Sequence, residues 1–131
     1  MRLNEIYQTY KDSVEFYCAY IKEAHPEDSE GGYRSESNAK LGIIIDQPTV
    51  IDERADAAEA CVLALNLEMP MLLDDMTNQI EIAYRAWPDR LFVLDADGRV
   101  TYHSAQGPHG FYPEDWEEAI QQVISTKVAA E

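Results

Sequence analysis

The sequence has few cysteines, few basic residues and no long apolar run, and each shortage excludes a class of protein. Its 131 residues include two cysteines, Cys18 and Cys61, which form no CxxC pair, no cysteine–histidine zinc spacing and no disulfide framework. Both stand within apolar periodic segments, where a free cysteine behaves as a small hydrophobic residue. We interpret them as unreactive core residues, with reactive thiols as the alternative.

Basic residues are the second shortage. The chain has 10 Lys and Arg against 25 Asp and Glu, which gives a formal net charge of −15. Because this charge repels phosphate backbones and anionic lipid surfaces, we expect no nucleic-acid partner and no membrane partner. No apolar run approaches the ~20 residues of a membrane span, and the N-terminus does not resemble a secretory signal. These absences favour a cytoplasmic protein.

The apolar residues repeat at helical or strand spacing in an alternating order. At 131 residues with 46% hydrophobic residues, the chain is predicted to form a single domain over residues 1–131. Helical spacing predicts four helices: one over residues 2–13, one that begins at Thr49, one from Thr77 to Trp87 and one that begins at Pro113. Thr49 with Asp52 forms a variant of the capping box, Thr77 is the expected cap of the third helix, and proline suits the first position of the fourth. Buried strands are predicted at Val14–Ile21 and Pro70–Asp74, and the long loop 22–48 could contain a short strand at Leu41–Ile45.

A β-hairpin is the clearest local unit. Leu91–Leu94 and Val100–His103 are two short apolar stretches joined by an Asp-Gly turn, which is a hairpin signature. Strands interleaved with helices and closed by a hairpin and a helix predict an α/β fold with a mixed sheet. The segment WPDR before this hairpin looks like the proline–hairpin–helix half of a thioredoxin domain, a likeness that implies a cis Trp87–Pro88 peptide bond.

Four blocks of sequence carry a more specific resemblance. They are YIKEAHPED at 20–28, PMLLDDM at 70–76 followed by Asn78, AYRAWPDRLFV at 83–93 and GPHGF at 107–111. In the same order, they resemble the YI-x-EAHPSD, PVVVDTM-x-N, AY-x-x-x-P-x-RLYV and GP-x-G-[FY] motifs of the iodothyronine deiodinase family. The chain is most similar to a bacterial-type member of that family.

The resemblance implies a thioredoxin-like, three-layer α/β/α fold and a redox activity. Members of the family remove iodine reductively from phenolic rings, using a selenocysteine or cysteine in a GS-x-[UC]-PPF-type turn after the first core strand. That strand and that turn have no counterpart in the 131 residues. We therefore expect either an altered sheet or the truncation of a longer sequence. In an altered sheet, Val14–Ile21 would pair directly with Leu91–Leu94, another chain would supply a strand, or Leu41–Ile45 would take the place of the missing strand.

The same resemblance implies a set of site residues. His25 would bind the phenolic end of a substrate or relay a proton, with Glu23 and Tyr20 bordering the proton path. The non-functional alternatives are that His25 is a surface residue, that Glu23 is a solvated acid and that Tyr20 only packs in the sheet. Trp87, Pro88 and Gln106 are the implied substrate-binding residues; Gln106 stands where the animal enzymes have an arginine, so a guanidinium clamp for a carboxylate is missing.

No cofactor and no metal are expected. A metal site could in principle use Asp74, Asp75, His103 and His109, but nothing in the spacing of these residues supports one. The expected partner is a small phenolic or thiol substrate, and a homodimer is left open.

Two functions follow from these observations. The first is a deiodinase-like oxidoreductase, inactive as this chain because the nucleophile segment is absent. The second is a non-catalytic small-molecule or protein-binding module that kept the fold. A GS-x-C-P-type turn encoded upstream of Met1 would support the first.

Overall fold

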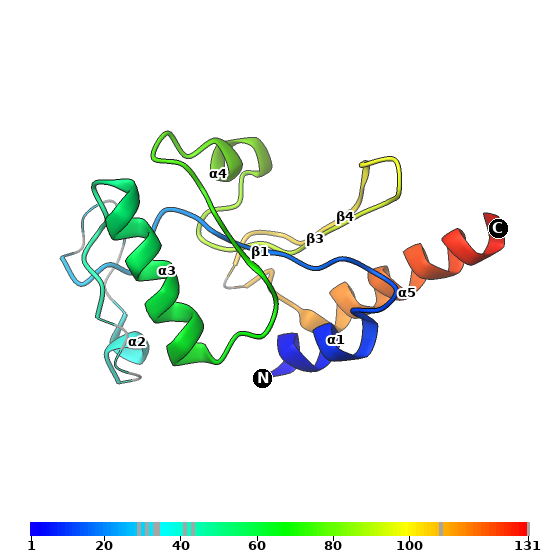
Figure 1. The fold of residues 1–131 in the computed structure, drawn as a ribbon, viewed down its shortest axis with the longest axis horizontal. Coiled ribbons are helices and arrows are strands. Elements are labelled where there is room, and N and C mark those ends of the chain that lie inside the picture. Colours follow the sequence, from blue (N-terminus) through cyan, green and yellow to red (C-terminus); the bar gives the residue numbers. More distant parts are fainter. Residues whose placement is uncertain are drawn as a thin grey trace. The chain divides into compact units, whose positions relative to one another are not determined.

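The computed structural model of the chain describes residues 1–28, 30, 32, 35–40, 42, 44–107 and 109–130. Helices and strands alternate along the described chain, as Figure 1 shows. In order they are α1 (Arg2–Tyr10), β1 (Cys18–Tyr20), α2 (Glu36–Lys40), α3 (Ile51–Leu65), β2 (Met71–Leu73), α4 (Gln79–Tyr84), β3 (Phe92–Leu94), β4 (Val100–His103) and α5 (Pro113–Ala130). The predicted α/β class is confirmed.

The strands pair in two ways. β1 and β2 are parallel, with Cys18 opposite Met71 and Tyr20 opposite Leu73, whereas β3 and β4 are antiparallel. Among the described residues these are two separate two-stranded sheets, not the single mixed sheet that was expected. Of the proposed strand Leu41–Ile45, residues 41 and 43 lie outside the described residues, and Ile44 and Ile45 belong to no strand.

The chain forms two compact units. Unit 1 comprises Met1–Phe16 and Asp89–Glu131, and unit 2 comprises Tyr17–Pro88. The expectation of a single domain stays a prediction.

The core of unit 1 lies where α5 packs against the hairpin β3–β4 and against α1. Trp116 is buried and its indole Nε1 donates to the Phe92 carbonyl oxygen at 3.0 Å. The Phe16 ring meets the rings of Tyr7 and Trp116 edge to face, with centroids 5.5 and 5.6 Å apart. Phe16 was predicted within a strand that begins at residue 14; instead it precedes β1 and belongs to this aromatic core.

The predicted hairpin is confirmed. Its turn is closed by the Asp95 carboxylate, which accepts the Asp97 and Arg99 N–H groups at 2.9 Å each. Gly98 has φ of 81°, a left-handed conformation that glycine adopts without steric cost. The turn chemistry therefore matches the sequence signature.

Unit 2 is built on the parallel pair, with α3 packed against β2. Arg54 of α3 is 2% exposed, and its Nη1 donates to the Asp75 carbonyl oxygen at 2.6 Å. This buried guanidinium ties the helix to the chain that leaves β2.

Two helix starts differ from the predictions. Thr49 does not cap α3: the N-cap is Val50, and Thr49 instead donates its N–H and its hydroxyl to the Glu53 carboxylate at 3.1 and 2.6 Å. Asp52, the predicted partner of Thr49, takes part in neither of these two hydrogen bonds.

Thr77 does not cap α4 either. The N-cap residue is Asn78, and the Asp74 carboxylate, whose residue is 1% exposed, accepts the Ile80 and Glu81 N–H groups at 2.9 and 3.0 Å. The helix ends at Tyr84, so Trp87 lies beyond it. An acid several residues upstream reaches the helix start because the chain turns back after β2, which local spacing cannot reveal.

Candidate functional site

The clearest cluster of polar side chains in unit 2 lies just after β1. Tyr20 ends that strand, and its hydroxyl donates a short hydrogen bond to Oε2 of Glu23. The other carboxylate oxygen, Oε1, accepts the main-chain N–H of His25 at 3.2 Å. The structure thus joins all three residues predicted at this turn; His25 meets Glu23 through its main-chain N–H, and the residue is exposed.

The Tyr20 phenol is held in its protonated form. Burial raises its pKa most, and the hydrogen bond to Glu23 and the negative charge of that carboxylate raise it further. A hydroxyl in this setting keeps its proton and acts as a hydrogen-bond donor, because ionising it would place a second negative charge beside the first.

The thiol of Cys61 on α3 belongs to the same neighbourhood. Burial and the charge of Glu23 raise its pKa to about 11, while hydrogen bonding with Tyr20 acts in the opposite direction. Burial also raises the pKa of the Cys18 thiol. Since the thiolate is the nucleophile, the raised pKa values disfavour reaction of either thiol at neutral pH. Both cysteines are half-buried and lie outside the core in which they were predicted.

The predicted substrate-binding residues fall in both units. The Trp87–Pro88 bond is cis, as predicted, and Lys22 places its Nζ 5.9 Å from the centroid of the Trp87 ring, a cation–π contact. Gln106 belongs to unit 1, where its carbonyl oxygen accepts the Gly110 N–H at 3.2 Å. Residue 108 of the GPHGF block lies outside the described residues.

Gln47 is a contributor to the turn that sequence reasoning missed. Its side-chain Oε1 accepts the Glu23 N–H at 3.2 Å, and its Nε2 donates to the carbonyl oxygens of Glu23 and Glu30 at 3.0 and 2.7 Å. A single glutamine in an aperiodic loop gives no pattern to read. Only the folded path of residues 22–48 brings it to Glu23.

Two of the residues considered as metal ligands, Asp74 and His103, make other contacts. Asp74 caps α4, and Nδ1 of His103 lies 2.9 Å from Arg90 Nη2. No group of three or more potential ligands occurs in the part of the chain that the structure describes.

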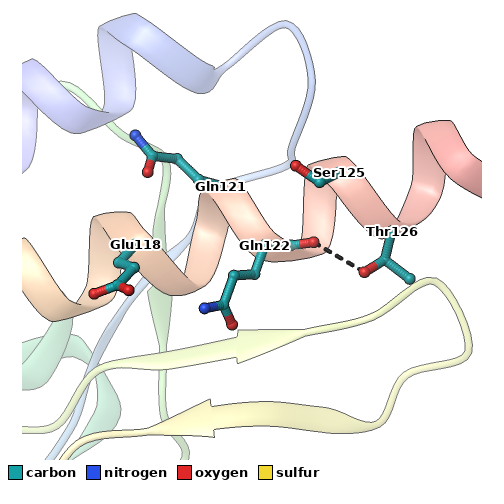
Figure 2. Close-up of a pocket in the computed structure, with 5 residues that line it drawn as sticks. All are labelled: Glu118, Gln121, Gln122, Ser125 and Thr126. Atoms are coloured by element: carbon teal, nitrogen blue, oxygen red, sulfur yellow. Dashed lines mark hydrogen bonds between the residues drawn. The ribbon is translucent and has the colours of Figure 1, made fainter.

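A hollow of about 580 Å³ lies along α5 in unit 1, far in sequence from Tyr20, Glu23 and His25. Figure 2 shows its lining, which is formed by Glu118, Gln121, Gln122, Ser125 and Thr126. The Thr126 hydroxyl donates to the Gln122 carbonyl oxygen at 3.0 Å, as is common within helices. None of the predicted site residues lines this hollow.

The comparison with protein families supplies the deciding observation. The model of the family described as iodothyronine deiodinase matches residues 2–123. The chain belongs to the iodothyronine deiodinase family. Its fold is therefore of the thioredoxin-like α/β type.

Individual deiodinases agree with this assignment. The chain is 29% identical over 112 residues to the type I iodothyronine deiodinase of Xenopus laevis, covering 86% of this chain and 41% of that protein. It is 32% identical over 102 residues to the thyroxine 5-deiodinase of Ovis aries (78% and 32%) and 33% identical over 105 residues to that of Homo sapiens (78% and 31%). The chain thus spans less than half the length of these deiodinases.

Within the described residues of this deiodinase-family chain, no helix has the length and apolarity needed to cross a bilayer.

Proposed function

We propose that the chain carries a proton-relay site of a deiodinase-like redox activity, with Tyr20, Glu23 and His25 as its residues. The hydrogen-bonded Tyr20–Glu23 pair is the observation on which the proposal depends. Its location at the carboxyl end of a parallel strand is where open α/β sheets usually bind ligands.

The proposed substrate is a small iodinated phenol, with related thiol or peroxide chemistry as the broader class. Reductive removal of iodine replaces a ring C–I bond with C–H: a thiolate or selenolate takes the iodine as an S–I or Se–I bond, and the ring carbon gains a proton. His25 would supply that proton, and the hydrogen-bonded Tyr20 and Glu23 would border its path. Trp87 and Pro88 are the proposed contacts for the ring, and the binding role of Gln106 stays a prediction.

We infer that the 131 residues alone do not turn over substrate. The two thiols have raised pKa values and are partly buried, so neither suits attack on iodine at neutral pH. The same observation favours the second candidate, a non-catalytic module that binds a small molecule or a protein. The expected cytoplasmic location and the homodimer remain proposals.

An experiment with an added nucleophile separates the two candidates. The purified chain is mixed with thyroxine and a small aryl selenol, and iodide release is measured against the selenol alone. The redox proposal expects the chain to accelerate release, and expects Tyr20→Phe and His25→Gln to remove most of the acceleration while His109→Gln retains it. No acceleration, with thyroxine still shifting the NMR signals of Tyr20 and Trp87, would contradict the redox proposal and support a binding module.

A further inference from the structure

Gln47 makes an unusual set of contacts for a loop side chain. Its amide both accepts from the Glu23 N–H and donates to the Glu23 carbonyl oxygen, at 3.2 and 3.0 Å. This reciprocal pair imitates the hydrogen bonds that two strands exchange, so it fixes the main chain of Glu23 in both directions. The side chain is half-buried, which shields these bonds from water.

The loop around Gln47 is closed by further contacts. The Gln47 N–H donates to the Asp28 carboxylate at 3.2 and 3.3 Å, and the Glu27 N–H donates to the Ile45 carbonyl oxygen at 2.8 Å. A Cβ added to Gly32 would lie 2.4 Å from the Ala24 carbonyl oxygen, so the returning chain packs directly on this turn. The turn that Gln47 stabilises therefore also fixes the position of Gln47.

Fixing the Glu23 main chain determines where its carboxylate can reach. One oxygen meets the Tyr20 hydroxyl and the other meets the His25 N–H. Without the amide pair, the Glu23 backbone could rotate and both contacts would loosen together.

We propose that Gln47 is a positioning residue, which holds the main chain of Glu23 so that its carboxylate stays hydrogen-bonded to the Tyr20 hydroxyl. The catalytic meaning of this role rests on the proposed function. The positioning itself concerns the folded chain and is testable without turnover.

The test compares Gln47→Met, which preserves length but removes both amide groups, with Gln79→Met, the same change at an exposed glutamine of α4. The readout is the Tyr20 hydroxyl proton in the NMR spectrum, assigned with Tyr20→Phe. We expect a protected downfield signal in the unchanged chain and in Gln79→Met, and its loss in Gln47→Met together with a fall in the pKa of Tyr20. Because weaker folding alone can also accelerate exchange of a buried hydroxyl proton, the pKa of Tyr20 in the folded variant is the readout that a merely structural role would not change.

An unchanged Tyr20 signal in folded Gln47→Met would overturn the proposal. If that variant does not fold, the side-chain amide of Gln47 is observed in the unchanged chain: slow hydrogen exchange of its NH2 group is expected, and exchange at the rate of a free glutamine would overturn the proposal. These outcomes differ from failure of the selenol assay, which would count against the redox function but leave the positioning role intact.

Discussion

The carboxylate of Glu23 acts on two neighbouring side chains. It accepts the Tyr20 hydroxyl, and its charge helps to raise the pKa of Cys61 to about 11. The negative charge of Glu23 therefore disfavours ionisation of both the Tyr20 hydroxyl and the Cys61 thiol.

Glu23→Gln should lower the pKa of Cys61, because it removes a negative charge that opposes thiolate formation. A lower pKa increases the thiolate fraction at pH 8, so alkylation of Cys61 by N-ethylmaleimide should accelerate severalfold. The rate is measured in a Cys18→Ala background, so that it reports one thiol.

Glu59→Gln is the matched control, since it makes the same charge change on the helix that carries Cys61. Equal acceleration by both variants would contradict a specific effect of Glu23.

Gly110→Ala should destabilise unit 1. An added Cβ would lie 2.5 Å from the carbonyl carbon and oxygen of Ala105, which are backbone atoms and cannot rotate away. The expected cost is about 1–3 kcal/mol in urea unfolding.

Gly107→Ala is the companion variant, because there the obstacle is the carboxyl end of the Asp89 side chain. This side chain can rotate, so a smaller cost is expected. A cost equal to that of Gly110→Ala would show that the distinction between backbone and side-chain obstacles is wrong.

Individual site residues were predictable only through the family motif. Tyr20, Glu23 and His25 stand within one short block, so their proximity could be expected. Gln47 is separated from Glu23 by a loop that has no periodic pattern, and its role depends on how that loop folds back.

Helix α4 depends on a carboxylate outside its own first turn. Asp74 accepts the N–H groups of Ile80 and Glu81, and it also accepts that of Asp75 at 2.9 Å. Because α4 is a six-residue helix, this cap matters more than it would for a longer one.

Asp74→Ala should therefore lower the free energy of unfolding by about 1–3 kcal/mol, through loss of the cap and of buried hydrogen bonds. Hydrogen exchange of the Ile80 and Glu81 amides should accelerate in the variant. Asp56→Ala, an exposed position on α3, should leave these amides unchanged. Retained protection at both amides in Asp74→Ala would contradict the assigned cap.

The start of α3 predicts a pH dependence. Hydrogen bonds from Thr49 hold the pKa of the Glu53 carboxyl below its usual value of 4.5. A depressed folded-state pKa gives stability that is present above pH 4.5 and is lost as the pH falls through the lower folded value.

Glu53→Gln should accordingly flatten the acid side of a plot of urea midpoint against pH, and Thr49→Val should do the same by removing the hydroxyl donor. Asp52→Asn, which changes a charge at the neighbouring position, should leave the slope nearly unchanged. A steeper acid limb in Glu53→Gln would contradict the assignment.

Secondary structure was predicted well where periodicity was long, and poorly at element ends. The last helix was expected from Pro113, and α5 starts there, because proline and two acids suit a helix N-terminus. Thr49 and Thr77 looked like caps, but Val50 and Asn78 are the N-cap residues, and at α4 the Asp74 carboxylate reaches the helix start from upstream. Cap identity depends on where the preceding chain turns, which spacing alone does not specify.

For the whole molecule, the alternation of helices and strands was enough to predict the α/β class. The number of sheets was not predictable, because strand pairing depends on contacts between segments far apart in sequence. Parallel and antiparallel pairs were both expected, and both occur.

The net charge of −15 predicts that added salt stabilises the fold. Like charges repel in the compact state, and raising the ionic strength from about 0.01 to 0.15 M shortens the screening length from roughly 30 to 8 Å. The Tm should rise by several degrees over this range.

The combined variant Asp56→Asn, Glu59→Gln, Asp97→Asn should show a smaller rise, since it carries fewer exposed acids. A Tm that stays constant or falls with salt in the unchanged chain would contradict the argument.

The two tryptophans lie one in each unit, and this placement gives each unit its own fluorophore. Trp116 sits in the aromatic core of unit 1, while Trp87 in unit 2 has a lysine ammonium near its ring. Trp116→Phe would leave emission from Trp87 alone, and Trp87→Phe would leave emission from Trp116 alone. Comparing the two denaturation curves would reveal whether both units melt in one transition.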